Sequence, residues 1–567
     1  MQFYSWIMSG LVASASAAAM TVTYDYIIVG GGTAGGALAT RLSLGLPKLK
    51  ILLLEAGPAA LDDVRINVLG MRGSILGTSY DWNVSSVAQT GLNGRSISVN
   101  RGKVLGGSSA MNFLCYDRAA SAEHDAWGEL GSPGWNWDTM IHGMTKSENF
   151  TGNDGDVHGR TGPVKSTYNC IVPDVLKTWQ EAVNKLGVPT NNGRLSRRRP
   201  SRSHLPAKGW ANLLVRTNAH VAKVLFSQSK DLTATGVALE DGSTIRARKE
   251  VILSAGSIQS PGLLELSGLG QDAVFAKAGV KKLLSLPGVG ENYQDHLRTF
   301  NTYRLKEGYE SFDPMIFDGE STLAKKQFEL WLQTKLLWYD YTSSAYAFLN
   351  WADVSDEAEK DLISLANDGF ASNSTVVDKK KLKYLSDPSI PQLELLLEAN
   401  YVGAAGYLGG KFITIFSSIM HPMSRGSVYI NPDAPRGKPD IDLKYLTNEY
   451  DVRALVEGAK LARKVAETEP LRSVWEAETK PGPDVTTDKQ FRDFAVKTVN
   501  SFYHPIGTCA MVPKKNGGVV DANLKVYGTK SLRVIDASII PVQLSGHIQT
   551  AVYGIAETVA QKIIAAP

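Results

Sequence analysis

Residues 24–35 read YDYIIVGGGTAG, and this stretch decides the fold class. Residues 26–29 form a short apolar, partly β-branched run, which is typical of a buried parallel strand. A helix-like segment follows at 35–45, and the run KILLLEAG at 50–57 predicts a second buried strand that ends at Glu55. Strand, helix and strand in this order predict a βαβ unit.

The glycines between the first strand and the helix fit the pattern G-x-G-x-x-G. Glycines at these positions permit a tight turn and a close backbone approach to a pyrophosphate at a helix N-terminus. An acid about 20 residues further on can accept hydrogen bonds from a ribose. An isolated glycine turn in an unrelated α/β fold is the alternative, and the unit does not separate NAD from FAD. We predict a dinucleotide site at Gly30, Gly32, Thr33, Ala34, Gly35 and Glu55.

Two further glycine-rich stretches lie at 100–112, NRGKVLGGSSAMN, and at 251–270, VILSAGSIQSPGLLELSGLG. In the first, Gly106 and Ser109 belong to a loop of small residues whose backbone N–H groups can approach a phosphate or a flat ring. In the second, Ser260 and Pro261 resemble the N-cap and first position of a helix. Either stretch alone indicates only a turn.

Length and composition limit the class of protein. The chain has 567 residues, so two domains, formed in part from interleaved segments, are expected. A net charge of +4 argues against nucleic acid as the main partner. Three cysteines, Cys115, Cys170 and Cys509, allow at most one disulfide.

The N-terminal segment MQFYSWIMSGLVASASAAAM resembles a secretory signal. Its apolar run at 3–12 is followed by small residues suited to cleavage, and it is too short and interrupted to form a stable membrane span. Residues 1–19 are therefore a predicted signal peptide, and we expect a secreted protein. Three glycosylation sequons, at Asn83, Asn149 and Asn373, agree with this without adding much.

His504 lies in NSFYHPIGTCAMV, residues 500–512. A metal ligand, a catalytic base and a buried structural histidine are all compatible with the stretch alone. No Cys-x-x-Cys pair and no His/Cys cluster with zinc spacing is present in the sequence, which weakens the metal interpretation. We predict no metal site.

Several separate motifs together resemble the glucose–methanol–choline (GMC) family of FAD oxidoreductases. They are the βαβ unit, RGKVLGGSSAMN, GSIQSPGLLELSGLG, PGVGENYQDH (287–296), HPMSRGSVYINP (421–432), HPIGTCAM and RVIDASIIPVQLSGHIQT. The resemblance implies an α/β fold in which a Rossmann-like FAD-binding domain is interleaved with an α+β substrate-binding domain that has an antiparallel sheet and flanking helices. The FAD-binding domain would comprise 22–60, 95–120, 210–300 and 500–567. The substrate domain and cap would comprise 61–94, 121–209 and 301–499.

The resemblance also implies roles for residues outside the glycine motifs. His504 and His547 would face the substrate beside the flavin as the catalytic pair. Apolar residues at helical spacing from Ala551 to Ile564 predict a C-terminal helix that starts near Ser545-Gly546. The resemblance implies that its N-terminus points at the flavin, where it would favour negative charge. His296, His421 and Arg425 would have positioning or structural roles. Further cofactor contacts would come from Asn112, Val221, Asp536, Ala537, Gln549 and Thr550, with a turn or cap as the alternative role of Asp536.

One segment departs from the family pattern. Residues 191–209, NNGRLSRRRPSRSHLPAKG, are short and strongly basic where similar proteins usually have a longer stretch. We expect a solvated loop or a doubtful gene model there, and an anion site at Arg197, Arg198 and Arg199 is the alternative. Residues 305–400 carry little recognisable pattern.

The leading hypothesis is oxidation of a primary or secondary alcohol, or of an alcohol-bearing metabolite. His504 would take the hydroxyl proton, a non-covalent FAD would take a hydride, and oxygen or a quinone would reoxidise the flavin. FAD is expected to be non-covalent because no histidine stands in 101–112. A lyase or cyclase that uses the same histidines as acid and base is the alternative, and a binding-only flavoprotein is a third class.

Overall fold

The computed structural model describes residues 23–152, 157–168, 172–190, 196–198, 211–227, 231–334, 338–340, 344–370, 374–402, 406–407 and 409–566. The predicted signal peptide, Cys170 and the Asn373 sequon lie outside these residues. The Asn83 sequon is exposed on the described surface.

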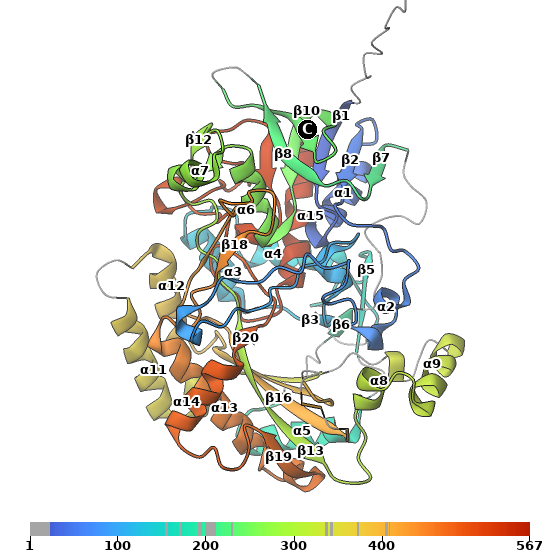
Figure 1. The fold of residues 1–567 in the computed structure, drawn as a ribbon, viewed down its shortest axis with the longest axis vertical. Helices are drawn as coiled ribbons and strands as arrows, with labels where there is room; N and C mark the ends of the chain where they lie inside the picture. The colour runs from blue at the N-terminus through green and yellow to red at the C-terminus, as the bar shows by residue number, and fades with distance from the viewer. Residues whose placement is uncertain are drawn as a thin grey trace, which may run out of the picture.

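A mostly parallel sheet carries the nucleotide end of the molecule, at the top of Figure 1. The predicted βαβ unit is present as β1 (Thr23–Val29), α1 (Thr33–Gly45) and β2 (Ile51–Leu54). The strand order is β7 (Leu213–Arg216), β2, β1, β10 (Thr244–Leu253), β9 (Ala234–Leu239) and β8 (Val221–Phe226), and β21 (Leu532–Val534) also pairs with β10. Chain segments far apart in sequence thus form one α/β layer, which confirms the predicted interleaving.

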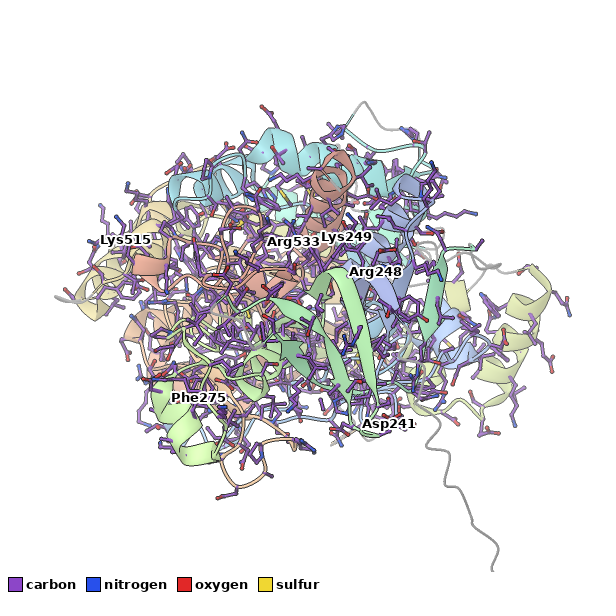
Figure 2. The ribbon with its side chains drawn as sticks, turned by 90° about the horizontal axis from the view of Figure 1, so that it is seen from above. Asp241, Arg248, Lys249, Phe275, Lys515 and Arg533 are labelled. Atoms are coloured by element: carbon purple, nitrogen blue, oxygen red, sulfur yellow. The ribbon has the colours of Figure 1, made fainter. Side chains whose placement is uncertain are left out.

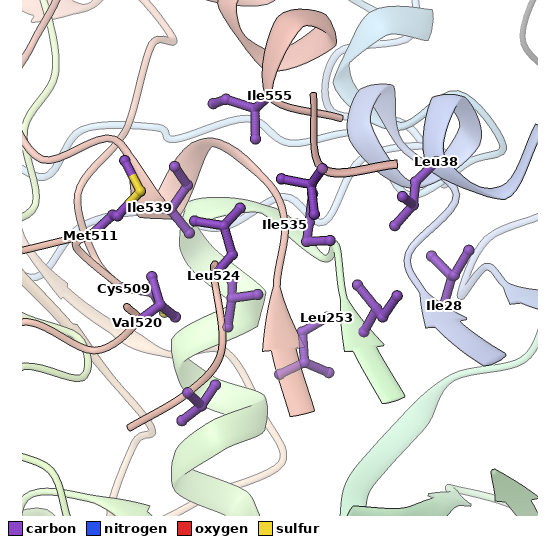
Figure 3. Close-up of a cluster of buried hydrophobic side chains, with 14 of the residues drawn as sticks. Ile28, Leu38, Leu253, Cys509, Met511, Val520, Leu524, Ile535, Ile539 and Ile555 are labelled. Atoms are coloured by element: carbon purple, nitrogen blue, oxygen red, sulfur yellow. The ribbon is translucent and has the colours of Figure 1, made fainter. Parts of the chain in front are cut away.

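The apolar core of this domain lies between the sheet and the helices that cover it. Ile28 and Leu253 come from the central strands β1 and β10, Leu38 from α1, and Ile555 from α15 (Gln549–Ala565). Figure 3 shows these side chains together with Cys509, which is fully buried and unpaired among the described residues. Cys509 is therefore a packed core residue.

Ion pairs tie β10 to its neighbours at the outer end of the sheet. Arg248 contacts Asp25 of β1 at 2.8 Å, and Arg533 of β21 contacts Glu250 at 2.6 Å. Figure 2 shows Arg248 and Arg533 near this end, seen from above.

An antiparallel sheet forms the other half of the molecule. Its order is β14 (Ser344–Leu349), β15 (Leu393–Glu398), β16 (Phe412–Ile419), β13 (Leu297–Leu305) and β19 (Trp475–Lys480), and β20 (Asn500–Ser501) also pairs with β13. Helix α13 (Glu449–Ala466) packs on this sheet in the lower part of Figure 1. The domain boundary predicted at residue 300 falls inside β13, so this strand carries the chain from one half to the other.

Shorter elements connect and cover the two halves. The helices are α2 (Val64–Asn67), α3 (Ser121–Glu129), α4 (Trp137–Ser147), α5 (Asp174–Lys185), α6 (Gly256–Leu266), α7 (Asp272–Ala278), α8 (Asp313–Phe317), α9 (Thr322–Thr334), α10 (Trp351–Val354), α11 (Asp356–Gly369), α12 (Val376–Leu385) and α14 (Asp488–Thr498). The 3₁₀ turns are η1 (Leu69–Met71), η2 (Thr90–Leu92), η3 (Gly107–Ala110), η4 (Trp338–Asp340), η5 (Leu471–Val474), η6 (Lys514–Asn516) and η7 (Ala537–Ile539). The small strands are β3 (Cys115–Tyr116), β4 (Glu148–Phe150), β5 (Val164–Thr167), β6 (Ser196–Arg198), β11 (Leu269–Gly270), β12 (Leu284–Ser285), β17 (Ser427–Tyr429) and β18 (Asp440–Asp442).

Two predicted helix starts are wrong. Helix α6 begins at Gly256, so Pro261 lies inside it and not at its first position. The missing N–H of Pro261 would have bonded the Ser257 carbonyl, which instead accepts the Thr508 hydroxyl at 2.7 Å. Helix α15 begins at Gln549 rather than near Ser545, whose backbone N–H donates to Glu123 at 2.6 Å.

Part of the basic segment is not a loop. Residues 196–198 form β6, which pairs with β3 and β5 in a four-stranded sheet. Backbone pairing therefore overrides the loop that the run of arginines suggested. Arg199 and residues 200–210 lie outside the described residues.

Close packing of α15 against α4 depends on glycine. A Cβ on Gly143 would lie 2.5 Å from the Gly554 carbonyl oxygen and 2.9 Å from the Thr558 hydroxyl oxygen. We expect Gly143→Ala to lower the free energy of unfolding by about 1–3 kcal/mol, because neither backbone can yield without separating the helices. Chemical denaturation measures this. Gly262→Ala in α6, whose nearest atom would be 3.8 Å away, is the control and should not destabilise the protein; equal losses in both variants would contradict the packing argument.

Candidate active site

A cavity of about 1680 Å³ lies between the two sheets. One end is lined by the glycine turn after β1 and by Glu55, Ala219 and Val221. The other end is lined by strands of the antiparallel sheet, and His504 and His547 lie in its wall. The predicted nucleotide site and the predicted catalytic pair therefore open into one continuous space.

Most of the predicted cofactor residues line this cavity. They are Gly30, Gly32, Thr33, Ala34, Glu55, Ser109, Asn112, Val221, Asp536, Ala537 and Gln549. Three do not line it. Gly35 packs against Gly30, Gly106 donates its backbone N–H to the Gly31 carbonyl at 2.8 Å, and the Thr550 hydroxyl donates to the Asp117 carbonyl at 2.5 Å. These three residues support the neighbouring residues that line the cavity.

The glycines of the first turn have different tasks. A Cβ on Gly35 would lie 1.9 Å from the Gly30 carbonyl oxygen, so Gly35 permits the helix to approach the strand. A Cβ on Gly32 would meet only the Gly107 Cα, at 3.8 Å, which is an ordinary contact. The packing of the protein therefore does not require glycine at position 32, and the space beside Gly32 is part of the cavity.

Glu55 ends β2 as predicted. Its two carboxylate oxygens accept the backbone N–H groups of Gly31 and Gly57, both at 2.8 Å. Burial raises its pKa to about 7 even though these N–H groups oppose the shift. Each oxygen keeps a second lone pair, so the side chain can still accept a hydroxyl from a ligand.

Asp536 and Gln549 organise the centre of the cavity. Asp536 caps η7 through Ser538 and accepts the Gly256 N–H at 2.9 Å and the Ser260 hydroxyl at 2.6 Å. Gln549 donates to the Ser109 hydroxyl at 2.8 Å and accepts from the Asn112 amide at 3.1 Å. The capping role considered for Asp536 is therefore present, and its carboxylate also lines the cavity.

His504 is oriented by a chain of hydrogen bonds. The Nε2 atom of His296 lies 2.8 Å from the Leu544 carbonyl oxygen, which only accepts, so His296 carries its proton on Nε2. Burial lowers the pKa of His296 well below its ordinary value, so its Nδ1 is an acceptor. The Nδ1 of His504 lies 2.9 Å from that atom and therefore carries a proton.

This assignment leaves the Nε2 of His504 with a lone pair. No described residue hydrogen-bonds to that atom, and it is not enclosed by protein. Burial, followed by the nearby His547 and His296, lowers the pKa of His504 well below its ordinary value. His504 is thus a neutral imidazole that presents a proton acceptor to the cavity.

His547 has the opposite electrostatic environment. Its backbone N–H and its Nδ1 contact the two oxygens of Asp117 at 2.8 and 2.6 Å. Its Nε2 lies 3.7 Å from Glu394 and is enclosed. Burial alone would lower its pKa, but the charges of Asp117, Cys115 and Glu394 together raise the pKa of His547 well above its ordinary value. His547 is therefore an imidazolium, with its ring centroid 5.0 Å from that of His504.

Sequence reasoning missed the carboxylates beside His547. Asp117 and His547 are 430 residues apart, so no local spacing links them. Glu394 is a charged residue in the otherwise apolar strand LELLLE, and that contrast is a signal the sequence did carry. Burial raises the pKa of Glu394 to about 7.

The remaining predicted histidine and arginine have structural roles. His421 is fully buried and contacts Glu123 at 2.7 Å, and Glu123 in turn holds the Ser545 backbone ahead of His547. Arg425 pairs with Asp378 at 2.9 Å. In the described part of the chain no group of three or more His, Cys, Asp or Glu side chains could hold a metal ion, and no helix is long and apolar enough to cross a membrane.

Two family models described as GMC oxidoreductase match the chain, over residues 24–298 and 422–556. The chain is a GMC oxidoreductase. The GMC oxidoreductase family protein Mala s 12 of Malassezia sympodialis is 33% identical, over 96% of this chain and 92% of the relative. Pyranose dehydrogenase 3 of Leucoagaricus meleagris is 30% identical, over 94% and 92% of the two chains. Oxygen-dependent choline dehydrogenase of Pseudomonas putida is also 30% identical, over 96% and 94%.

Solved structures share the whole architecture with this GMC oxidoreductase. An FAD-dependent oxidoreductase from Chaetomium thermophilum has a TM-score of 0.86 at 27% identity, covering 95% of this chain and 99% of the other. A formate oxidase variant from Aspergillus oryzae has a TM-score of 0.85 at 25% identity, with coverage of 96% and 98%. The protein is an FAD-dependent enzyme of the oxidase and dehydrogenase class.

The residues of the cavity fit FAD. Gly32 leaves room for a pyrophosphate at the start of α1, Glu55 offers an acceptor to a ribose, and Val221 and Ala219 form an apolar surface beside them. The loop around Ser109 and the Asp536 carboxylate lie between this end and the histidines. These groups would hold the cofactor.

Two glycine substitutions separate cofactor binding from folding. Gly32→Ala should leave the thermal stability of the apoprotein unchanged but weaken FAD binding by roughly tenfold or more, because its methyl group enters only the cavity. Gly35→Ala should lower the stability of the apoprotein itself, because its Cβ would collide with backbone. Thermal unfolding of apoprotein and FAD titration measure the two effects. Normal FAD affinity in Gly32→Ala would contradict this placement of the pyrophosphate.

Proposed function

We propose that this GMC oxidoreductase oxidises a primary or secondary alcohol, with His504 as the catalytic base. The observation that supports this most strongly is the neutral imidazole whose Nε2 lone pair faces the cavity, held by His296 and the Leu544 carbonyl. A base of this kind can accept a hydroxyl proton without first losing one to solvent.

The reaction balances as the loss of a proton and a hydride from one carbinol group. The O–H proton passes to the Nε2 of His504 as the C=O bond forms. When bound, FAD would supply the acceptor for the hydride, and oxygen or a quinone would reoxidise it. A neutral His504 is regenerated when its proton leaves to solvent.

His547 has a supporting role in this proposal. Its ring nitrogens face Asp117 and Glu394, so its charge is fixed beside His504 and its Nε2 is not directed at the substrate. A fixed cation 5.0 Å from the base, between ring centroids, favours negative charge on a substrate oxygen as its proton leaves. This role differs from the expectation that both histidines face the substrate.

Similarity to known proteins supports the reaction class. The electron acceptor, oxygen or a quinone, is part of our proposal. The names of the similar proteins include a pyranose dehydrogenase and an oxygen-dependent choline dehydrogenase.

We propose non-covalent FAD, because the loop of residues 101–112 contains no histidine to which the flavin ring could be joined.

Anaerobic mixing of the FAD-loaded enzyme with a panel of alcohols tests this function. Bleaching of the oxidised flavin band is expected, together with formation of one aldehyde or ketone per flavin reduced. His504→Gln should keep FAD bound but slow flavin reduction by about 10²–10⁴-fold, because the base is lost. A persistently oxidised flavin with substrate conversion would instead indicate a lyase or cyclase. Near-normal reduction in His504→Gln would remove its assigned role.

The pH dependence follows from the two histidines. His504 acts only when neutral, and its pKa is lowered, so kcat/KM should stay high down to below pH 6.5 and fall only at lower pH. Asp117→Asn removes the charge that most strongly raises the pKa of His547. His547 then becomes neutral, the pKa of His504 rises, and the acid limb should move to higher pH. The pH profile of kcat/KM measures this shift. An acid limb that does not move in Asp117→Asn would contradict the coupling between the two histidines. Asp174→Asn, at an exposed residue, is the control and should leave the profile unchanged.

A further inference from the structure

The cavity-facing surface of the antiparallel sheet carries two cations, Arg298 and Lys480. Side chains alternate along a strand, so Leu297, Tyr303 and Leu305 of β13 enter the core beneath the sheet. Arg298 and Phe300 point the other way and line the cavity. Lys480 at the end of β19 also lines the cavity and lies beside Phe300, with its Nζ 5.5 Å from the centroid of the Phe300 ring.

Arg298 lies among aromatic rings. Its guanidinium carbon is 4.6 Å from the ring centroid of Phe416, 5.7 Å from that of Phe502 and 6.0 Å from that of Tyr503. Its Nε donates to the Ser501 carbonyl at 3.2 Å. These contacts fix the plane of the guanidinium, and Arg298 lines the cavity.

No carboxylate in the described part of the chain lies within ion-pair distance of Arg298 or Lys480. Two other cations of the cavity wall are paired: Arg72 contacts Glu398 at 2.5 Å, and Lys325 contacts Glu320 at 2.8 Å. A partly buried guanidinium without an anion is unfavourable, so an anion that enters the cavity gains the interaction.

Asp295 is the nearest competitor for the charge of Arg298, and its hydrogen bonds are already made. Its Oδ1 accepts the backbone N–H groups of His296 and His504, both at 2.9 Å. Its Oδ2 accepts hydroxyls from Tyr293, Tyr445 and Ser501 at 3.2, 2.9 and 2.5 Å. Asp295 therefore acts on Arg298 only through space.

The cations lie at a defined place relative to the base. Phe502 contacts both groups: its ring centroid is 5.7 Å from the guanidinium carbon of Arg298 and 5.4 Å from the ring centroid of His504. The ring of Phe502 thus lies between the guanidinium of Arg298 and the imidazole of His504. A ligand about as long as one substituted aromatic ring can therefore reach both groups.

We propose that the substrate is an alcohol that carries a carboxylate, with the carboxylate bound by Arg298 and Lys480 while its carbinol group lies at the Nε2 of His504. This inference rests on the proposed function and specifies its substrate class. The planar guanidinium suits a carboxylate through two parallel hydrogen bonds, and Lys480 adds a second positive charge. Phe300, Phe416 and Phe502 supply an apolar surface that suits a ring or chain between the two ends.

A matched pair of substrates tests the charge alone. We use 4-(hydroxymethyl)benzoate and its neutral counterpart 4-(hydroxymethyl)benzamide, which have nearly the same shape. The wild-type enzyme should show a kcat/KM ratio of at least about tenfold in favour of the carboxylate. Arg298→Gln should lower kcat/KM for the carboxylate by about tenfold or more and bring the ratio to about one. Arg298→Lys should restore part of the preference, and Lys480→Gln should reduce it.

The control is Lys325→Gln, since Lys325 also lines the cavity but is already paired with Glu320. Its ratio should equal that of the wild type. Two results would overturn the inference. One is an equal kcat/KM of the wild type for both substrates, and the other is an equal fall in kcat/KM for both substrates in a folded Arg298→Gln variant.

A binding measurement separates this inference from the proposed function. 4-Methylbenzoate and 4-methylbenzamide have no carbinol group, and their dissociation constants follow from changes in flavin absorbance. Tighter binding of the benzoate that is lost in Arg298→Gln supports the anion site even if no alcohol bleaches the flavin, in which case the oxidation proposal alone fails. Bleaching by both alcohols with equal binding of the two methyl compounds removes the anion site and leaves alcohol oxidation standing.

Discussion

A chain of two hydrogen bonds, from His504 through His296 to the Leu544 carbonyl, determines the chemistry of this active site. The carbonyl can only accept, so the proton positions of both rings follow from it. His504 consequently presents a lone pair to the cavity. Any change that reversed this chain would turn the base into a donor.

The fold supports that chain from both halves of the molecule. His296 directly precedes β13 of the antiparallel sheet, and Leu544 lies in the segment between β21 and α15 of the nucleotide domain. Asp295 accepts the backbone N–H groups of His296 and His504 and fixes their separation. The catalytic geometry is thus made at the junction of the two domains, where neither domain alone could complete it.

Charge gives different roles to the two histidines of the proposed catalytic pair. Burial beside another cation keeps His504 neutral, whereas Asp117 and Glu394 keep His547 charged. Similar residues thus gain opposite protonation states from their partners. Arg298 and Lys480 extend the positive field along the cavity wall, and their unpaired charges place the proposed anion site one ring away from the base.

The fold, and the placement of both histidines in the cavity wall, could be predicted from local patterns and motif resemblance. The βαβ unit follows from strand, glycine turn and acid within residues 24–55, and His504 follows from motif resemblance. The different roles of the two histidines could not be predicted, because Asp117 and Glu394, which are distant in sequence, reach His547 only in the folded structure. The start of α6 was missed because the Thr508 hydroxyl replaces a backbone donor, a contact that no local pattern contains.

The protonation of the ring nitrogens is the most direct test of this account. Nitrogen NMR of the FAD-loaded enzyme with labelled histidine, assigned by single His→Gln variants, reports which ring atoms carry protons between pH 6 and 8. We expect His504 to be neutral with its proton on Nδ1, His296 to be neutral with its proton on Nε2, and His547 to carry both protons. A proton on the Nε2 of His504 in this range would contradict its role as the base.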